Sequence, residues 1–417
     1  MGSERLTVDR EVRFESGRRS TRTGKKKRTA RGMTTPQARR SLLTLLSMVT
    51  IDLIGFGVVI PILPFYAEAY GASATVLGVL LTSYAAMQFL FAPIWGRFSD
   101  RFGRRRTMLL TLAGTGLALT LLGFADSLWG LFAARILGGI FAANVSVATA
   151  YITDLTSEAE RTRWMGLIGA AFGVGFLLGP GLGGALAPLG YAVPIRVAAA
   201  LAAVNWIYAF FVLREPERLR PSAVELGTAS LAALAQVEVR RLCVACFIFT
   251  CGVSQLETVF AFFMMDRFGY DARHVAFILV AMALVMAVIQ GGLIRTLALR
   301  FGERRLMLGG GLLLAGSFAA VPWAHTVGLL MIPLGISAVG RAIAHPAMLS
   351  LVSTAADERR RGTVMGSFQA SASLARVFGP TLAGLLYDRY LALPFLAASV
   401  LMVVVVFLAK RLRPRMG

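Results

Sequence analysis

The stretch GRFSDRFGRRR, at residues 96–106, decides the fold because it separates two long apolar runs, 75–95 and 107–125. Each run can cross a hydrocarbon core of about 30 Å, which needs roughly 20 residues of helix. The stretch holds five arginines, and loops on the cytoplasmic side of a membrane collect Lys and Arg. It therefore predicts a cytoplasmic loop between two membrane-spanning helices, with Asp100 as the acidic member of an ion-pair latch.

The composition is that of a membrane protein that crosses the bilayer several times. Of 417 residues, 56% are hydrophobic and 16% are charged, whereas soluble domains carry about 25% charged residues. The net charge of +21 would suit a nucleic-acid binder, but 13 of the Lys and Arg residues lie in residues 1–40 and most others lie in short loops. We expect no nucleic-acid partner, and we expect the basic loops to attract anionic lipids.

Twelve membrane spans are expected, and the loop charges set their direction. The tails and alternate loops carry 36 Lys and Arg residues, against three in the loops on the other side. This contrast predicts an even number of spans with both termini cytoplasmic, in a bacterial inner membrane. The expected spans are 42–66, 75–96, 107–125, 128–151, 164–186, 191–213, 242–265, 274–294, 306–322, 327–353, 364–387 and 391–409.

An internal repeat divides the chain into two halves. Residues 161–190 and 361–390 align at an offset of 200, and residues 299–305 repeat the basic loop with a leucine in place of its acid. Two parallel six-helix halves suit a transporter that rocks around a central site, and we expect a monomer. The expected divisions are a disordered basic cytoplasmic tail (1–41), a six-helix bundle (42–213), a cytoplasmic linker (214–241), a second bundle (242–409) and a short cytoplasmic tail (410–417).

Several stretches resemble a known family. Residues 96–106 resemble the signature loop between helices two and three of major facilitator transporters, and residues 51–64 resemble the first helix of their twelve-span drug:proton antiporters. Residues 134–154 resemble the fourth-helix motif with its buried arginine, and 169–184 resemble the fifth-helix antiporter motif. Residues 84–88 look like the tetracycline-efflux branch. The resemblance implies an all-α major facilitator fold of 12 transmembrane helices in two pseudo-symmetric six-helix bundles, and drug:proton antiport.

The ninth span departs from this pattern. Some tetracycline exporters are expected to use an acidic residue there, but residues 306–322 contain no charge. Either the proton site lies elsewhere, or the substrate differs.

The resemblance also assigns a gating latch. It implies that Asp100 interacts with the cytoplasmic start of the eleventh span when the protein opens outward, and that Arg104 pairs with Asp154. The expected latch residues are Gly96, Asp100, Arg101, Gly103, Arg104 and Asp154.

The fifth span carries a glycine face that allows close approach of a second backbone. Pro180 bends this helix because it removes a hydrogen bond. We expect the halves to slide along this face, and the resemblance implies a tight seal against proton leak. The motif comprises Gly175, Gly179, Pro180, Gly183 and Gly184.

Charges within the spans are the candidate proton-coupling residues, because each costs at least about 2.5–3.5 kcal/mol to insert. Asp52 in span 1 and Arg135 in span 4 lie at depths that differ by about 5 Å, so we expect them to pair. Proton exchange at Asp52 against substrate would then drive export. The alternative is a purely structural pair.

Glu257 in span 7 is the second candidate for proton or cation binding, with a polar contact near the rim as the alternative. Arg341 and His345 in span 10 share a helix face, and either contact an anionic substrate group or pair with Glu257. We expect Arg376 to hold the interface between the halves. The expected substrate cavity is lined by Gln88, Asn144, Tyr84, Gln255, Phe260, Arg341 and His345, although the polar members can instead be hydrogen bonds between helices.

These features predict a proton-coupled exporter of small amphipathic molecules, with tetracycline-like substrates among the possibilities. The sequence contains no nucleophile–base set, nucleotide loop or metal cluster, so we expect neither an enzyme nor a cofactor. Two alternatives remain open, a nutrient importer driven by protons or by its own gradient, and a membrane receptor that does not transport.

Overall fold

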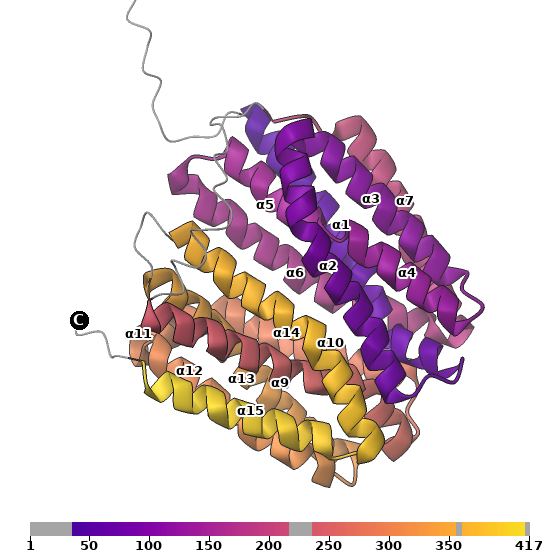
Figure 1. Ribbon diagram of the computed structural model, residues 1–417, viewed down its shortest axis with the longest axis vertical. Coiled ribbons are helices and arrows are strands. Elements are labelled where there is room, and N and C mark those ends of the chain that lie inside the picture. The colour runs from indigo at the N-terminus through magenta and orange to yellow at the C-terminus, as the bar shows by residue number, and fades with distance from the viewer. Residues whose placement is uncertain (1–35, 217–235, 356–360, 413–417) are drawn as a thin grey trace, which may run out of the picture.

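The computed structural model describes residues 36–216, 236–355 and 361–412, and all regular secondary structure in these ranges is helical (Figure 1). The expected tail 1–41 lies mostly outside the described residues, as do most of the linker 214–241 and residues 413–417 of the last tail.

The helices form two bundles in chain order. The amino-terminal half contains α1 (Pro36–Glu68), α2 (Ala74–Phe102), α3 (Arg104–Gly123), α4 (Leu128–Phe141), α5 (Asn144–Leu155), α6 (Glu158–Leu186), η1 (Ala187–Leu189) and α7 (Ala192–Val212). The carboxy-terminal half contains α9 (Val237–Phe268), α10 (Ala272–Val288), η2 (Ile289–Leu293), α11 (Ile294–Phe301), α12 (Glu303–Ala320), η3 (Val321–Trp323), α13 (Val327–Ala355), α14 (Arg361–Arg389) and α15 (Leu393–Lys410).

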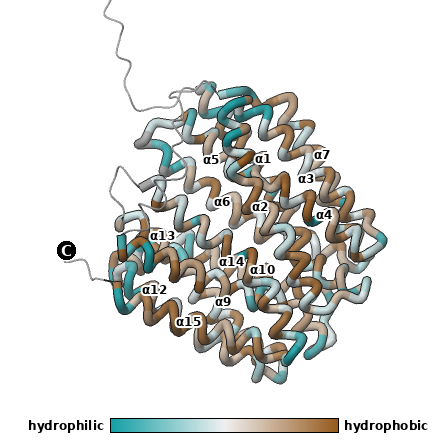
Figure 2. The backbone as a smooth tube through the Cα atoms, viewed as in Figure 1, coloured by the Kyte–Doolittle hydropathy of each residue, from teal (hydrophilic) through white to brown (hydrophobic). Residues whose placement is uncertain are grey.

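Within the described ranges, eleven helical segments are long and apolar enough to cross a membrane. α14 takes the place of the remaining expected span, 364–387; it is 29 residues long and carries Gln369 and Arg376 among its apolar residues. Figure 2 shows apolar colouring along the helices and polar colouring gathered at their ends.

Two spans are interrupted where the sequence predicts continuous helices. The fourth span breaks between α4 and α5, at Ala142 and Ala143. The eighth span contains the π-helical turn η2 between α10 and α11. π-Helical turns and breaks inside helices occur frequently at functional sites.

The repeated basic loop makes the same contact in both halves, which supports the internal duplication. Arg105 donates hydrogen bonds to the carbonyl oxygens of Phe210 and Leu213 at the end of α7, both 2.6 Å. Arg304, which aligns with Arg105 in the repeat, donates to Ala409 and Lys410 at the end of α15. Each arginine therefore satisfies carbonyls that the last helical turn leaves free.

Among the described residues, the two halves pack closely at one end and not at the other. We call the end with the basic loops the arginine-rich end, and the other the arginine-poor end. At the arginine-poor end, a Cβ placed on Gly78 of α2 would collide with Pro380 of α14, and one placed on Gly184 of α6 would collide with Ala276 of α10. A Cβ on Gly384 of α14 would likewise collide with the backbone of α2.

Toward the arginine-rich end the same helices separate. Cβ atoms placed on Gly96 of α2, Gly169 of α6 or Gly366 of α14 would meet nothing within 4 Å. The buried apolar clusters agree, because one cluster joins both halves at the arginine-poor end, whereas the residues around Met48 and Tyr151 form a separate cluster within the amino-terminal half. The molecule is therefore open toward its basic loops.

The glycine motif of α6 packs differently from the expectation. Gly175, Gly179 and Gly183 lie against Leu53, Gly57 and Val58 of α1, within the same half. Gly184 is the member that meets the other half, at α10. Most of this glycine face therefore fixes α6 to α1 and is not the sliding surface between the halves.

Candidate functional site

Asp52 lies at the midpoint of α1, sixteen residues from either end of the helix. Its carboxylate accepts a hydrogen bond of 3.0 Å from the side-chain amide of Asn144, and this amide lies 3.4 Å from the hydroxyl of Thr115. Asn144 is buried, and the oxygen of its side-chain amide, Oδ1, has no hydrogen-bond partner among the described residues. The carboxyl of Asp52 is therefore held by a neutral amide.

The expected pair between Asp52 and Arg135 does not form. The described residues include no ion pair between them; the guanidinium of Arg135 instead lies over the ring of Tyr84, 4.0 Å from its centroid. Arg135 is buried, and its Nε has no hydrogen-bond partner in the described chain. Tyr84 also lies near Asp52, so the ring of Tyr84, and not the carboxylate of Asp52, is the contact that the structure gives for the Arg135 guanidinium. Helix depth alone could not reveal this contact with Tyr84.

The break between α4 and α5 builds this part of the site. It frees backbone carbonyls in the middle of a span, which must be satisfied within the protein. Gln88 donates a hydrogen bond of 3.1 Å to the carbonyl of Ala142, and the indole of Trp95 donates one of 2.6 Å to Ile140. Gln88 therefore stabilises the break, and α5 then begins with Asn144 placed against Asp52.

Glu257 and Arg341 form an ion pair of 2.5 Å between α9 and α13. The side chains are 52% and 34% exposed, respectively, although Arg341 lies midway along a membrane-spanning helix. A charged pair against lipid is costly, so partial exposure at this depth indicates contact with water. Arg341 therefore pairs with Glu257, which is one of the two arrangements that the sequence predicts for it.

Two further basic residues lie near Arg341. The ring of His345 lies 6.2 Å from that of Phe249, and both Arg341 and Arg376 are within electrostatic range of His345. Arg376 is exposed near the middle of α14, and no ion pair or hydrogen bond of its side chain occurs among the described residues. It makes no such bond to the other half, in contrast to its expected role at the interface.

Gln255 and Phe260 do not line an open cavity, in contrast to the expectation. Gln255 is fully buried, and its amide nitrogen lies 3.4 Å from the carbonyl of Cys251 and 3.3 Å from that of Gly379. It therefore joins α9 to α14. Phe260 is 3% exposed and belongs to the apolar core. Polar and aromatic residues within spans look alike in sequence whether they face a cavity or a neighbouring helix.

The latch residues form a network around Arg104. Its guanidinium contacts Asp100 at 2.8 Å and Asp154 at 2.7 Å, and donates a hydrogen bond of 2.8 Å to Ser99. Arg104 and Asp154 are buried, so removing either partner would leave an uncompensated charge inside the protein.

The other latch residues surround this network. Gly103 adopts a φ of 104°, which favours glycine at the turn. Arg101 lies over the Phe102 ring, 5.4 Å from its centroid, and Gly96 faces open space. Asp100, in the last turn of α2, pairs with Arg104 at the start of α3 in this state.

Glu215 belongs to the same network and was not predicted. Its carboxylate accepts hydrogen bonds of 2.6 Å and 2.9 Å from the backbone N–H groups of Arg104 and Arg105. An acid at a helix N-terminus satisfies free N–H groups and the helix dipole. The start of the linker is therefore bound to the start of α3.

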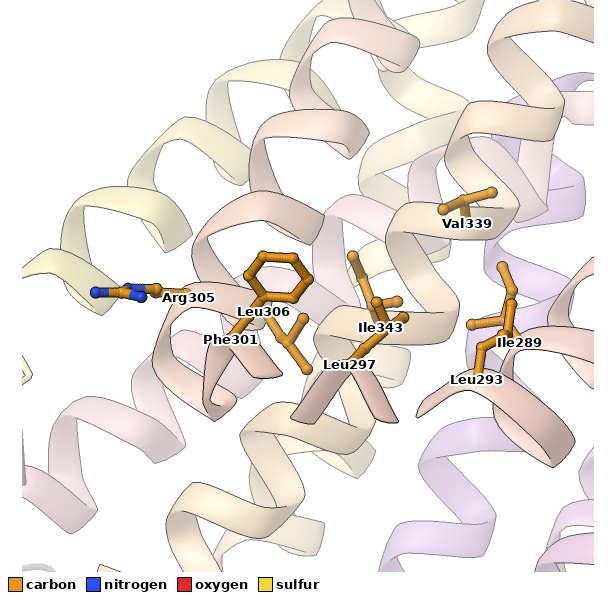
Figure 3. Close-up of a pocket in the computed structure, with 8 residues that line it drawn as sticks. All are labelled: Ile289, Leu293, Leu297, Phe301, Arg305, Leu306, Val339 and Ile343. Carbon is orange, nitrogen blue, oxygen red and sulfur yellow. The ribbon is translucent and has the colours of Figure 1, made fainter. Parts of the chain in front are cut away.

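A pocket of about 380 Å³ lies apart from these charges, within the carboxy-terminal half (Figure 3). It is almost entirely apolar and is bounded by η2, α11, α12 and α13. Its lining residues are Ile289, Leu293, Leu297, Phe301, Arg305, Leu306, Val339 and Ile343. It contains none of the predicted site residues.

Two bundles that open at one end around charges in the middle of the spans are the architecture of an alternating-access transporter. The sequence profile of the Major Facilitator Superfamily matches residues 45–299 and 293–416. The chain belongs to the Major Facilitator Superfamily. This membership confirms the resemblance and the expected fold, and the chain is a transporter that crosses the membrane several times.

Several members of the superfamily are similar over most of their length. The class D tetracycline resistance protein of Salmonella ordonez is 32% identical over 81% of this chain and 87% of its own. Multidrug resistance protein 2 of Bacillus subtilis is 30% identical over 87% of this chain and 92% of its own.

Solved structures of other facilitators are similar as well. The human organic anion transporter MFSD10 is 28% identical and has a TM-score of 0.70, covering 90% of this chain and 100% of that one. A bacterial homologue of the human lysosomal transporter Spinster, in an inward-facing and occupied conformation, has a TM-score of 0.77 at 16% identity and covers 91% of this chain and 98% of that one.

Proposed function

We propose that this facilitator is a proton-coupled exporter of small amphipathic drugs that works by alternating access. The observation that carries the proposal is the carboxyl of Asp52, which lies at mid-membrane with a neutral amide as its hydrogen-bond partner. Such a carboxyl can gain or lose a proton without leaving a buried cation unpaired. The relatives named as tetracycline and multidrug resistance proteins support drug export.

We place the arginine-rich end in the cytoplasm of a bacterium, with both chain termini on that side of the inner membrane. The distribution of Lys and Arg between alternate loops supports this orientation. The opening described above then faces inward. In this orientation, residues 1–41, 214–241 and 410–417 are cytoplasmic, and the basic loops meet anionic lipid headgroups around a monomer.

The charges near the opening favour substrates with an acidic group. Near the middle of their spans, Arg376 is exposed and Arg341 is half-buried, and the exposed carboxylate of Glu257 already pairs with Arg341. Arg376 lacks a partner in the described chain, so an anion from the substrate would complete its site. A neighbour of known structure that is an organic anion transporter supports this substrate class.

In this scheme the two carboxyls have different tasks. Asp52 binds the proton, and the substrate binds near Arg341 and Arg376; the two binding events alternate. At Arg341 the substrate anion competes with Glu257. The Arg104 network holds the loop that is expected to close the cytoplasmic end, where Asp100 would leave Arg104 for the start of α14.

The test is the direction of proton movement in inverted membrane vesicles. Adding substrate to vesicles that hold a proton gradient should release protons from the lumen if the protein is an exporter. Proton movement in the same direction as the substrate would indicate an importer. A substrate that binds without any flux would indicate a receptor.

A further inference from the structure

The arginine-poor end is closed mainly by contacts between α14 and the first turns of α2, which lie side by side (Figure 1). Gly78 and Gly384 allow the two backbones to touch, as described above. Nearby, the hydroxyl of Thr82 donates a hydrogen bond of 2.8 Å to the carbonyl of Val377, and the hydroxyl of Thr381 donates one of 2.8 Å to Thr82. These bonds join the amino-terminal half to the carboxy-terminal half.

Asp388 adds hydrogen bonds from a charged carboxylate at the edge of this interface. One oxygen of its carboxylate accepts a hydrogen bond of 3.2 Å from the backbone N–H of Ala74, and the other accepts one of 2.9 Å from Thr75. These are the first two residues of α2, whose N–H groups have no partner within the helix. The N–H group of the next residue, Val76, donates a hydrogen bond of 3.4 Å to the hydroxyl of Ser73.

The carboxylate also complements the positive end of the α2 dipole, and hydrogen bonds to a charged acceptor are stronger than those between neutral groups. Burial would raise the pKa of Asp388, but the hydrogen bonds from Thr75 and Ala74 outweigh it, and this pKa lies below its ordinary value. The carboxylate is therefore ionised in this position.

Asp388 is fixed to the carboxy-terminal half. The adjacent Tyr387 donates a hydrogen bond of 2.7 Å to Asp266, which belongs to α9 of the same half. If the halves separate at this end, Asp388 leaves with α14, and the N–H groups of Ala74 and Thr75 lose their partner.

The corresponding helix of the other half is capped differently. α10 begins at Ala272, and Asp271, the residue before it, accepts a hydrogen bond of 3.1 Å from the N–H of His274. This cap lies within one half and is unaffected by separation. Capping of α2 by Asp388 therefore depends on the conformational state, whereas capping of α10 by Asp271 does not.

We propose that Asp388 is a gating residue, which holds the arginine-poor end shut by capping α2 across the interface between the halves. It would act opposite to the loop at Asp100, each acid serving one end of the molecule. The proposal holds whether the protein exports or imports its substrate, because both directions require this end to open and close.

The experiment measures the separation of the halves at this end. Spin labels are attached to Ala69→Cys in the amino-terminal half and Trp323→Cys in the carboxy-terminal half, in protein reconstituted into nanodiscs. Both positions are exposed and lie at the arginine-poor end. The three native cysteines are buried and should not compete for label. Double electron–electron resonance then gives the ratio of open to closed populations.

Asp388→Asn keeps the shape of the side chain but removes its charge and one acceptor oxygen. We expect it to raise the open-to-closed ratio about 5- to 10-fold, as the loss of a charged helix cap allows. The matched control, Asp271→Asn, should leave the ratio within about 2-fold of the wild type. Asp388→Glu restores the carboxylate and should return the ratio to the same range.

Three outcomes would overturn the proposal. The first is an unchanged ratio in Asp388→Asn, and the second is an equal shift in Asp271→Asn. The third is loss of folded protein in both Asp388 variants, seen by size-exclusion chromatography, which would assign Asp388 a structural role instead.

Discussion

The carboxylate of Asp52 and the amide of Asn144 form a hydrogen bond of 3.0 Å at the midpoint of α1, and no guanidinium shares this carboxylate in the described chain. The contact depends on the break in the fourth span, because α5 begins at Asn144. A structural ion pair would fix the charge of Asp52 throughout the cycle. We propose that the neutral partner leaves this carboxyl able to exchange its proton.

The ion pair between Glu257 and Arg341 should behave as a unit. Glu257→Gln or Arg341→Gln alone leaves one charge unpaired within a span, and each should lower the rate of transport at least about 10-fold. The double variant removes both charges and should be no slower than the slower single variant. Rates of substrate uptake into inverted vesicles provide the measurement, with Glu238→Gln at the far end of α9 as the control. Fully additive losses would contradict the pairing.

Arg376 should select for acidic substrates. Arg376→Gln removes a charged hydrogen-bond donor worth about 1.5–3 kcal/mol, so KM for an anionic substrate should rise about 10-fold or more. KM for a neutral substrate of similar size should stay within about 2-fold. Arg389→Gln, at the end of the same helix, is the matched control. Equal effects on both substrates would argue against an anion site.

The buried pair of Arg104 and Asp154 should stabilise the folded protein. Asp154→Asn leaves Arg104 with Asp100 as its remaining acidic partner and should lower the free energy of unfolding by roughly 3 kcal/mol. The melting temperature of purified protein in detergent reports this loss. Asp126→Asn, a loop acid at the opposite end, should leave the melting temperature unchanged. A similar decrease in melting temperature in both variants would show that the pair of Arg104 and Asp154 contributes no more to stability than a loop acid does.

The sequence predicted the contacts that depend on local patterns. The composition of the basic loop identified Asp100 as the acid of an ion-pair latch but not Arg104 as its partner. The family resemblance implied the pair of Arg104 with Asp154, which the structure contains. The ion pair between Glu257 and Arg341 was one of two expected arrangements for Arg341. It could be expected because both residues are charged and lie in spans that line the centre of the fold.

Other features depend on geometry that no short pattern carries. The expected ion pair between Asp52 and Arg135 does not form. Depth along a helix says nothing of the direction in which a side chain points, and the guanidinium of Arg135 lies over the ring of Tyr84 instead. The break at Ala142 has no proline to announce it, and its carbonyls are satisfied by Gln88 and Trp95 from a different helix. Asp388 and the first turn of α2 are 314 residues apart, and only the packing of the two halves brings them together.

The gate at Asp388 should respond to acid with a definite sign. Since the pKa of Asp388 lies below its ordinary value when the end is closed, its contribution to closure is present above the ordinary carboxyl pKa of about 3.9 and is lost as the pH falls through the lowered value. The open-to-closed ratio should therefore be flat from neutral pH down to about pH 5 and rise below about pH 4.

Other polar and acidic groups lie near Asp388, so the comparison must be made with a variant. Tyr387 and Asp266 lie beside Asp388 and remain in Asp388→Asn, which should lack the rise. The spin-label distance measured across this pH range tests the sign. A rise of equal size in Asp388→Asn would assign it to another group.

The most direct test of the account is proton release at Asp52. Substrate added to inverted vesicles that hold a proton gradient should release lumenal protons with the wild type and with Asp52→Glu, and Asp52→Asn should abolish the release while still binding substrate. Release at the wild-type rate by folded Asp52→Asn protein would contradict the claim that this carboxyl exchanges its proton for substrate.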